Sequence, residues 1–245
     1  MIDNKTGVAA LVTMLRARDT LSDDEEQVLH DSVSEVREIA AGKVIVRSGT
    51  DLENSTLLAQ GIIARYKDLA DGERQIQQLQ VAGDFVDLHG FLLKRIDHNI
   101  GAISHCRFAL VPHDRLKTIT ERHPHLARLL WFSTLLDASI QREATLSVGR
   151  RSALSRIAHM MCELRVRLEI VGLATVAGFQ LSMTQVDIAD ATGLTSVHVN
   201  RMLKQLRDQN VLTFRNGEVE IHDWTRLAEI AEFDPVYLHL ERRAR

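Results

Sequence analysis

The stretch QVDIADATGLTSVHVNRMLKQLR, residues 185–207, decides how the rest of the chain is interpreted. It predicts two helices, because Ala189 is small where two helices cross closely and Gly193 can take the left-handed conformation that a turn between them needs. The second helix begins at Thr195, a good N-cap residue. The arrangement is typical of a helix-turn-helix, with Thr192 as a departure where an apolar residue is usual. Its core-facing apolar residues are Ile188, Leu194, Val199 and Met202.

The second helix, predicted over residues 195–208, has polar side chains on the face opposite to its apolar residues. Arg201 can bond O6 and N7 of a guanine together, and Val197 can pack against a thymine methyl group. Serine and asparagine can reach bases or phosphates. An ordinary helical hairpin with a solvated polar face is the alternative interpretation. The candidate DNA-binding residues are Thr195, Ser196, Val197, Asn200, Arg201 and Lys204.

The sequence after this helix predicts a wing. Asn210 ends the helix, and residues 211–221 have the pattern of two short strands joined by the two-residue hairpin turn Asn216-Gly217. Together with the two helices, this predicts a winged helix-turn-helix. Arginines gather before the motif, where some suit phosphate contacts, although a charged solvated helix face would have the same pattern. These are Arg142, Arg150, Arg151, Arg156, Arg165 and Arg167.

The N-terminal half has a different pattern. Residues from about 8 to 33 read as helical, and Ser22 is a good cap for a segment that begins with acidic residues. From Val36 to about residue 111, short β-rich pieces are separated by turn signals. Many short strands at this spacing predict an antiparallel barrel or jelly roll. The turn signals are Ala41-Gly42, Ser48-Gly49, Asp71-Gly72 and Gly83-Asp84.

A long helix is predicted from Pro124 to about Gly149. Its apolar residues repeat at roughly heptad spacing, which predicts a parallel two-fold dimer; a single amphipathic helix lying on its own domain is the alternative. Gly149-Arg150-Arg151-Ser152 is typical of a hinge, and a further helix is predicted over residues 152–171. The candidate dimer interface is Leu129, Ser133, Leu136 and Ile140.

The composition is that of a globular protein long enough for two domains, with 245 residues, of which 45% are hydrophobic and 26% charged. Lys and Arg number 30 against 33 Asp and Glu, and this net charge of -3 argues against a protein that coats nucleic acid non-specifically. Cys106 and Cys162 specify neither a disulfide framework nor a zinc ribbon. Without a signal peptide or a run of 18 apolar residues, we expect a cytoplasmic protein that does not span a membrane.

The chain resembles the CRP/FNR family of bacterial transcription regulators over most of its length. The resemblance implies an α+β chain with three parts: N-terminal helices and a cyclic-nucleotide-binding-type β-roll (jelly roll) over residues 1–121, a dimerisation helix over 122–149 and a winged helix-turn-helix over 150–245. It implies a homodimer that binds palindromic double-stranded DNA, and RNA polymerase as a partner if the protein is an activator. The matching motifs are Gly193-Leu194-Thr195, Val199, Asn200-Arg201-Met202-Leu203-Lys204, Asp208-Gln209-Asn210, His123-Pro124, Arg156-Ile157-Ala158 and Gly83-Asp84-Phe85.

The chain departs from the family's patterns at the effector site and beside Arg201. Members that bind cyclic AMP hold the ribose with Gly-Glu-Leu and the phosphate with Arg-Ser; here Val86-Asp87-Leu88 and His98-Asn99 stand in those places and form the candidate effector pocket. Without the arginine a buried phosphate lacks its bidentate partner, so cyclic AMP is not expected and the effector stays unidentified. Val197 replaces a glutamate that commonly accepts from a cytosine, which implies an altered preference beside the guanine.

Three other interpretations remain open. A haem, metal or redox site is one, because His89, His98 and His105 with Cys106 flank the predicted pocket, but their spacing is that of no common metal motif. Two distant cysteines also cannot hold an iron–sulfur cluster. A cyclic-nucleotide or haem/redox-responsive receptor acting on a protein partner is the second. A cupin-like metalloenzyme is the third, but His123-Pro124-His125 begins a helix, so we expect no enzyme, no catalytic residue and no metal site.

Overall fold

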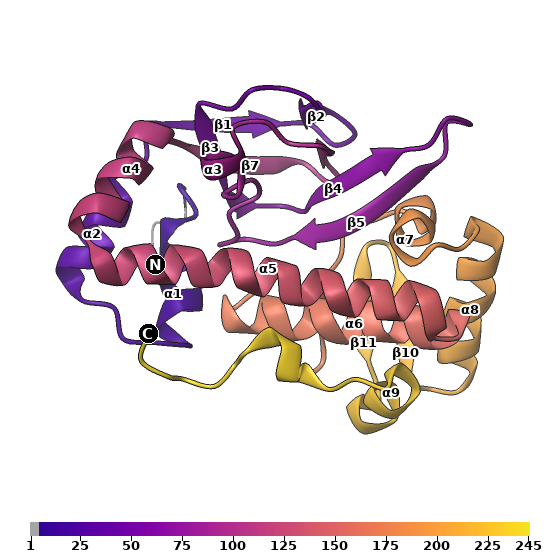
Figure 1. The fold of residues 1–245 in the computed structure, drawn as a ribbon. Helices are drawn as coiled ribbons and strands as arrows, with labels where there is room; N and C mark the ends of the chain where they lie inside the picture. Colours follow the sequence, from indigo (N-terminus) through magenta and orange to yellow (C-terminus); the bar gives the residue numbers. More distant parts are fainter. Residues whose placement is uncertain (1–4) are drawn as a thin grey trace. The chain divides into compact units, whose positions relative to one another are not determined.

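The computed structural model describes residues 5–245, which form two compact units (Figure 1). Unit 1 contains residues 5–66, Leu79–Ser139 and His239–Arg245, and unit 2 contains Lys67–Gln78 and Ile140–Leu238. The division falls inside the long helix, whereas the sequence placed domain boundaries near residues 121 and 149. Residues 1–4 of the first predicted domain lie outside the described part of the chain.

Most elements of the N-terminal half belong to unit 1, apart from most of β5 and the end of α5, and the predicted β-roll is confirmed. Two antiparallel sheets have the strand orders β1-β7-β3 and β2-β6-β4-β5. Strand β6 and the short helix α3 had no clear signal in the sequence. The elements are α1 (Val8–Arg16), α2 (Asp23–Asp31), β1 (Glu35–Ile39), β2 (Val44–Val46), β3 (Asn54–Gln60), β4 (Ile63–Asp68), β5 (Arg74–Gln80), α3 (Gly90–Leu93), β6 (Asn99–Ala102), β7 (Cys106–Pro112), α4 (His113–Arg122) and α5 (Pro124–Arg150).

Apolar residues of both sheets form the core of the roll, in a cluster that includes Leu58, Ile63 and Phe108. Strand register shows which side chains share this inner face. Ile63 lies opposite Ala102, and Arg65 lies opposite Ile100. Because side chains two residues apart in a strand point to the same side, Arg65 shares the core-facing side with Ile63.

Local sequence signals explain where several helices begin. Ser22 caps α2 as predicted: its hydroxyl accepts from the Glu25 N–H, and the Glu25 carboxylate accepts from the Ser22 N–H in return. The predicted hinge at residues 149–152 is narrower than expected, because α5 continues to Arg150 and Ser152 already caps α6. Among the described residues, no helix is both long and apolar enough to cross a bilayer.

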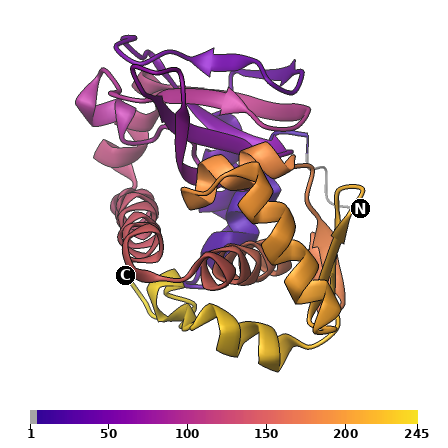
Figure 2. The same cartoon turned by 90° about the vertical axis from the view of Figure 1, so that its right-hand side faces the viewer.

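Unit 2 contains the predicted helix-turn-helix and wing. Its sheet has the order β10-β11-β9-β8, so the wing hairpin is two strands of a four-stranded sheet of which the sequence predicted only half. Helix α8 packs against α6, α7 and β10, and Figure 2 shows α7 and α8 in orange. The elements are α6 (Ala153–Ile170), β8 (Ala174–Thr175), β9 (Gly178–Gln180), α7 (Gln185–Thr192), α8 (Ser196–Asp208), β10 (Leu212–Arg215), β11 (Glu218–Ile221), α9 (Trp224–Ala231) and a 3-10 helix (Pro235–Leu238).

Candidate nucleic-acid interface and effector pocket

The turn between α7 and α8 has the geometry that its sequence predicts. Gly193 ends α7 with φ 64° and ψ 40°, in the left-handed region, and its N–H donates to the Ala189 carbonyl. Thr195 caps α8, since its hydroxyl oxygen accepts from the His198 N–H at 3.3 Å. The two residues therefore fix the point at which α8 begins.

Thr192 is buried in this turn although it is polar. Its side-chain hydroxyl donates to the Ile188 carbonyl at 2.7 Å, which satisfies the buried group. Its own carbonyl accepts a hydrogen bond from the Arg156 guanidinium at 3.1 Å. Because the last carbonyls of a helix have no partner within the helix, Arg156 of α6 supports the end of α7.

Helix α8 presents one apolar and one polar face. Val199, Met202, Leu203 and Leu206 are buried, whereas all six candidate DNA-binding residues are exposed, Val197 by 78%. The Asn200 amide N–H donates to Gln185 Oε1 at the start of α7 at 3.3 Å. His198 is also exposed, with its ring Nδ1 3.4 Å from the Thr195 hydroxyl. Gln185 and His198 are thus candidates for DNA contact that the sequence patterns did not single out.

Four of the six arginines before the motif have partners within the chain, whereas the sequence left open whether some of the six contact phosphate. Arg165 and Arg167 are buried and pair within α6 with Glu169 at 3.1 Å and Glu163 at 3.0 Å. Arg151 pairs with Glu143 at 2.7 Å, and Arg156 supports α7. At the wing, in contrast, Arg215 is exposed beside the turn.

The wing turn itself is confirmed. Asn216 and Gly217 have φ values of 52° and 76°, and the strands pair from Arg215 opposite Glu218 to Leu212 opposite Ile221. Two successive residues at positive φ are typical of the type I′ hairpin turn, for which Asn-Gly is a preferred sequence. The exposed Arg215 is therefore held at the tip of a rigid hairpin.

Both carboxylate oxygens of the candidate effector residue Asp87 accept hydrogen bonds inside the β-roll. One carboxylate oxygen accepts from the Thr56 N–H and the other from the Thr56 hydroxyl at 3.0 Å. Burial raises the pKa of Asp87 to about 6, although these hydrogen bonds and Arg65 act in the opposite direction. Val86 and Leu88 are buried beside it.

The second part of the predicted pocket, His98-Asn99, contacts other residues than Asp87 does. Asn99 Oδ1 accepts from the Ser48 N–H at 2.9 Å. The His98 ring is 5.2 Å from the ring of His89, and its Nδ1 is 3.1 Å from Asp97. Burial lowers the pKa of His89 to about 4, so this imidazole is neutral near pH 7.

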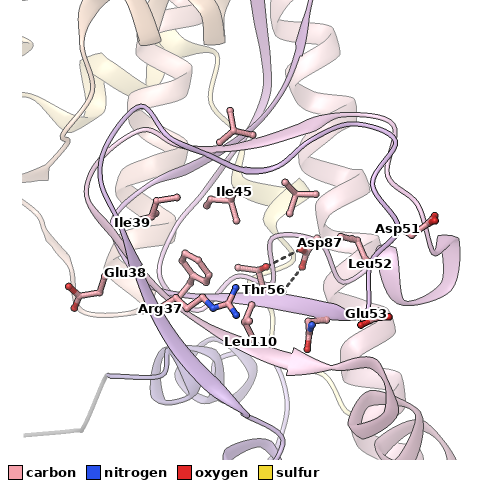
Figure 3. Close-up of a pocket in the computed structure, with 14 residues that line it drawn as sticks. Arg37, Glu38, Ile39, Ile45, Asp51, Leu52, Glu53, Thr56, Asp87 and Leu110 are labelled. Carbon is pink, nitrogen blue, oxygen red and sulfur yellow. Dashed lines mark hydrogen bonds between the residues drawn. The ribbon is translucent and has the colours of Figure 1, made fainter.

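A cavity of about 450 Å³ opens on the β1, β2, β3 and β7 side of the roll, with the Thr56–Asp87 hydrogen bonds at its lining (Figure 3). Of the five residues predicted for the effector pocket, Asp87 alone lines it. The cavity combines apolar and charged residues, a mixture that the sequence patterns did not reveal. It is lined by Arg37, Glu38, Ile39, Val44, Ile45, Val46, Asp51, Leu52, Glu53, Asn54, Thr56, Asp87, Phe108 and Leu110.

The apolar stripe predicted as the dimer interface of α5 faces the interior of its own chain. Leu129, Leu136 and Ile140 are buried, and the half-buried Ser133 donates its hydroxyl to the Leu129 carbonyl. A different apolar face of the same helix is open: Trp131 is 66% exposed and Leu135 53%. In the single chain the heptad-spaced residues are therefore packed inside, and the exposed apolar residues belong to another face of the helix.

The histidines and the cysteine that suggested a metal site do not converge on one site, although the rings of His89 and His98 are close to each other. His105 is exposed, with its Nε2 3.7 Å from Glu38, and Cys106 is buried with its thiol 3.3 Å from the Ile62 carbonyl. No group of three His, Cys, Asp or Glu within residues 5–245 has the arrangement of a metal site. Both cysteines are free, and burial raises the pKa of the Cys106 thiol and raises that of Cys162 to about 12.

Two family models match the chain: a Crp-like helix-turn-helix domain over residues 155–230 and a cyclic nucleotide-binding domain over residues 36–123. The chain is 30% identical to the nitrogen fixation regulation protein FixK of Bradyrhizobium diazoefficiens, over 70% of this chain and 71% of FixK. It is 26% identical to the transcriptional activator protein FnrL of Cereibacter sphaeroides, over 86% of each.

Solved structures agree with these sequence matches. FixK2 from Bradyrhizobium japonicum has a TM-score of 0.74 and 27% sequence identity to the chain, and the match covers 81% of this chain and 97% of FixK2. The family models, the identity to FixK and the shared fold lead to the same assignment. The chain belongs to the CRP/FNR family and is a DNA-binding transcription regulator of that type.

Proposed function

We propose that the protein binds a palindromic site in double-stranded DNA as a homodimer and reads each half-site with α8. The observation that carries the proposal is the exposed polar face of α8, opposite a fully buried apolar face and fixed in place by Gly193 and the Thr195 cap. A helix held in this way can lie in a major groove with its first residues against base edges.

The residues on this face of α8 have several proposed roles. Arg201 donates two hydrogen bonds to O6 and N7 of a guanine, and Val197 contacts a neighbouring base through its methyl groups. Lys204 contacts a phosphate, where it adds affinity without sequence preference. Thr195, Ser196 and Asn200 complete the contact surface at the start of the helix.

Dimerisation is proposed through the open face of α5. Trp131 and Leu135 are four residues apart and therefore lie on one side of the helix. Both are exposed in the single chain, so pairing with the same face of a second copy would remove this apolar surface from water. A two-fold dimer would place the two half-site centres roughly 34 Å apart on one side of the duplex.

Cyclic AMP is not the proposed signal. The His98-Asn99 segment provides no guanidinium for a cyclic phosphate, and the Asp87 carboxylate is already bonded to Thr56. Calorimetry with cyclic AMP should therefore show no binding, whereas a micromolar dissociation constant with nucleotide-dependent DNA binding would contradict this assignment.

Selection of bound sequences from random DNA with the purified full-length protein tests the whole proposal. We expect enrichment of a palindrome that contains a guanine at the same position of each half-site. Light scattering at micromolar concentration should give twice the 27.6 kDa mass of one chain. Absence of any enriched palindrome, or a particle of only one chain, would show that the proposal is wrong.

A further inference from the structure

We propose that Arg65 serves as a built-in effector: its guanidinium binds residues 85–88, which we call the effector segment, and links them to α5, so unit 1 needs no diffusible ligand to support DNA binding. The proposal rests on the proposed function, because DNA binding is its readout. It is carried by contacts within unit 1 alone, since β4 up to Tyr66, residues 85–88 and α5 up to Ser139 all belong to that unit.

Arg65 is buried where an apolar residue would be expected. It shares the core-facing side of β4 with Ile63, and only 6% of its surface is exposed. Its Nε donates to the Val86 carbonyl and its Nη2 donates to the Phe85 carbonyl at 3.1 Å. A buried guanidinium is costly unless its N–H donors are satisfied, and these two backbone carbonyls accept hydrogen bonds from two of its nitrogen atoms.

The same guanidinium reaches the long helix. Its Nη2 forms an ion pair of 2.8 Å with Asp137, and these side chains are only 8% and 22% exposed. A charge-assisted hydrogen bond in such surroundings is stronger than one in water. Asp137 is two residues from Leu135 of the proposed dimer face, so one side chain joins the effector segment to the helix that forms the dimer.

Arg65 thus makes polar contacts to residues 85–88 and to α5 at the same time. The cavity of Figure 3 touches this segment only at Asp87, and neither Val86, Arg65 nor any residue of α5 lines it. The side chain thus supplies within the chain the contacts that a bound ligand would supply from solution. We therefore infer that the DNA-binding state is populated without a ligand.

Chemical rescue gives a direct test. The Arg65→Ala variant lacks the side chain beyond Cβ, which ethylguanidinium can replace. We expect wild-type protein to bind its selected palindrome without additives, Arg65→Ala to bind at least tenfold more weakly, and added ethylguanidinium to restore most of the affinity. Ethylurea has a similar shape but no charge and should not restore it. Thermal unfolding is measured in parallel, because a purely structural loss would lower the melting temperature along with the DNA affinity.

The control variant is Arg122→Ala, which removes an exposed arginine of unit 1 at the end of α4, away from the cavity and from residues 85–88. It should bind DNA like wild type and show no response to ethylguanidinium. Wild-type affinity in Arg65→Ala, or a well-folded Arg65→Ala that ethylguanidinium does not restore, would overturn the proposal.

If Arg65→Ala does not fold, the Asp137→Asn variant tests the link instead, because it keeps the shape of the Asp137 side chain and removes its charge. Weakened DNA binding by a folded Asp137→Asn protein supports the link, and unchanged affinity overturns it. Failure of wild-type protein to select any palindrome would instead show that the proposed function is wrong, so the two failures are distinguishable.

Discussion

Helix α8, the proposed recognition helix, and the effector segment, residues 85–88, differ in whether their polar groups have partners within the chain. On α8, Arg201 and Lys204 are exposed and make no ion pair with another residue in the described part of the chain. In the effector segment, Asp87 is bonded to Thr56 and the carbonyl of Val86 to Arg65. The first region keeps its groups available for a partner, and the second satisfies them internally.

This difference separates two kinds of mutational effect. Exposed, unpaired groups contribute little to folding, so their removal should change DNA binding and leave stability unchanged. Buried, paired groups are part of the folded core, so their removal should change the free energy of unfolding. Substitutions in exposed and in buried positions test this distinction.

Arg201→Ala should have the largest effect. Loss of a bidentate guanine contact costs roughly 1–3 kcal/mol in each half-site, and two half-sites roughly double it. Preference at that base pair should relax while the melting temperature stays the same. The measurement is the bound-sequence profile together with a binding titration; a profile identical to wild type at every position would refute the recognition-helix assignment.

Lys204→Ala is the matched control for Arg201, since it lies on the same open face. If Lys204 contacts phosphate, its removal should weaken all sequences about equally and leave the profile unchanged. The slope of log affinity against log salt should fall by about one unit per half-site.

Leu135→Asp should separate assembly from folding. Because Leu135 is 53% exposed in the single chain, a charge there should leave the chain folded but weaken the dimer by about 2 to 3 kcal/mol. DNA affinity should fall with the loss of the second half-site. Leu136→Ala is the comparison: it is buried, so it should lower folding stability. Light scattering and thermal unfolding of both variants decide, and a Leu135→Asp protein that remains a dimer would contradict the proposed interface.

Asp87→Asn should alter the pH dependence of stability. The pKa of Asp87 is raised from 3.8 to about 6, so the folded chain holds the proton more tightly than the unfolded chain. The free energy of unfolding should therefore decrease as pH rises through about 6, by no more than about 3 kcal/mol. The asparagine variant should lack this decrease. The decrease begins near the unfolded pKa of 3.8, so denaturant titrations at pH 4 and pH 8 measure it, and equal pH dependence in both proteins would argue against the assignment.

Gly193→Ala should have the smallest effect. A non-glycine residue at φ 64° costs about 1 kcal/mol, and the new Cβ would lie 3.3 Å from a Val148 methyl group. Gly149→Ala is the control, because Gly149 lies within α5 with nothing within 4 Å of a new Cβ. That substitution should raise stability by up to about 1 kcal/mol. A higher melting temperature for Gly193→Ala than for wild type would contradict the left-handed backbone conformation of Gly193.

The recognition region was predictable because its signals are local. The Thr195 cap, the Gly193 turn and the Asn216-Gly217 hairpin each depend on a few neighbouring residues, and the structure has all three where they were expected. Even the departure at Thr192 has a local solution, a hydrogen bond one helical turn back.

The other regions depend on contacts between distant segments, which spacing does not reveal. On α5, Leu136 and Leu135 are neighbours of the same type, and only tertiary packing decides that one is buried and the other open. Arg65 is a single arginine in a strand, and its partner Asp137 lies 72 residues further along the chain. One signal was available in the sequence: Arg65 is two residues from Ile63 and therefore lies on the same, core-facing side of the strand.

The two protected thiols make the protein a convenient carrier of reporter groups. Maleimides react with exposed thiolates, and both native cysteines are buried with raised pKa values. A cysteine introduced at an exposed position, such as Glu218→Cys at the wing, would therefore be labelled alone without first removing Cys106 and Cys162. A fluorophore placed there would follow the approach of the wing to a duplex in the otherwise native protein.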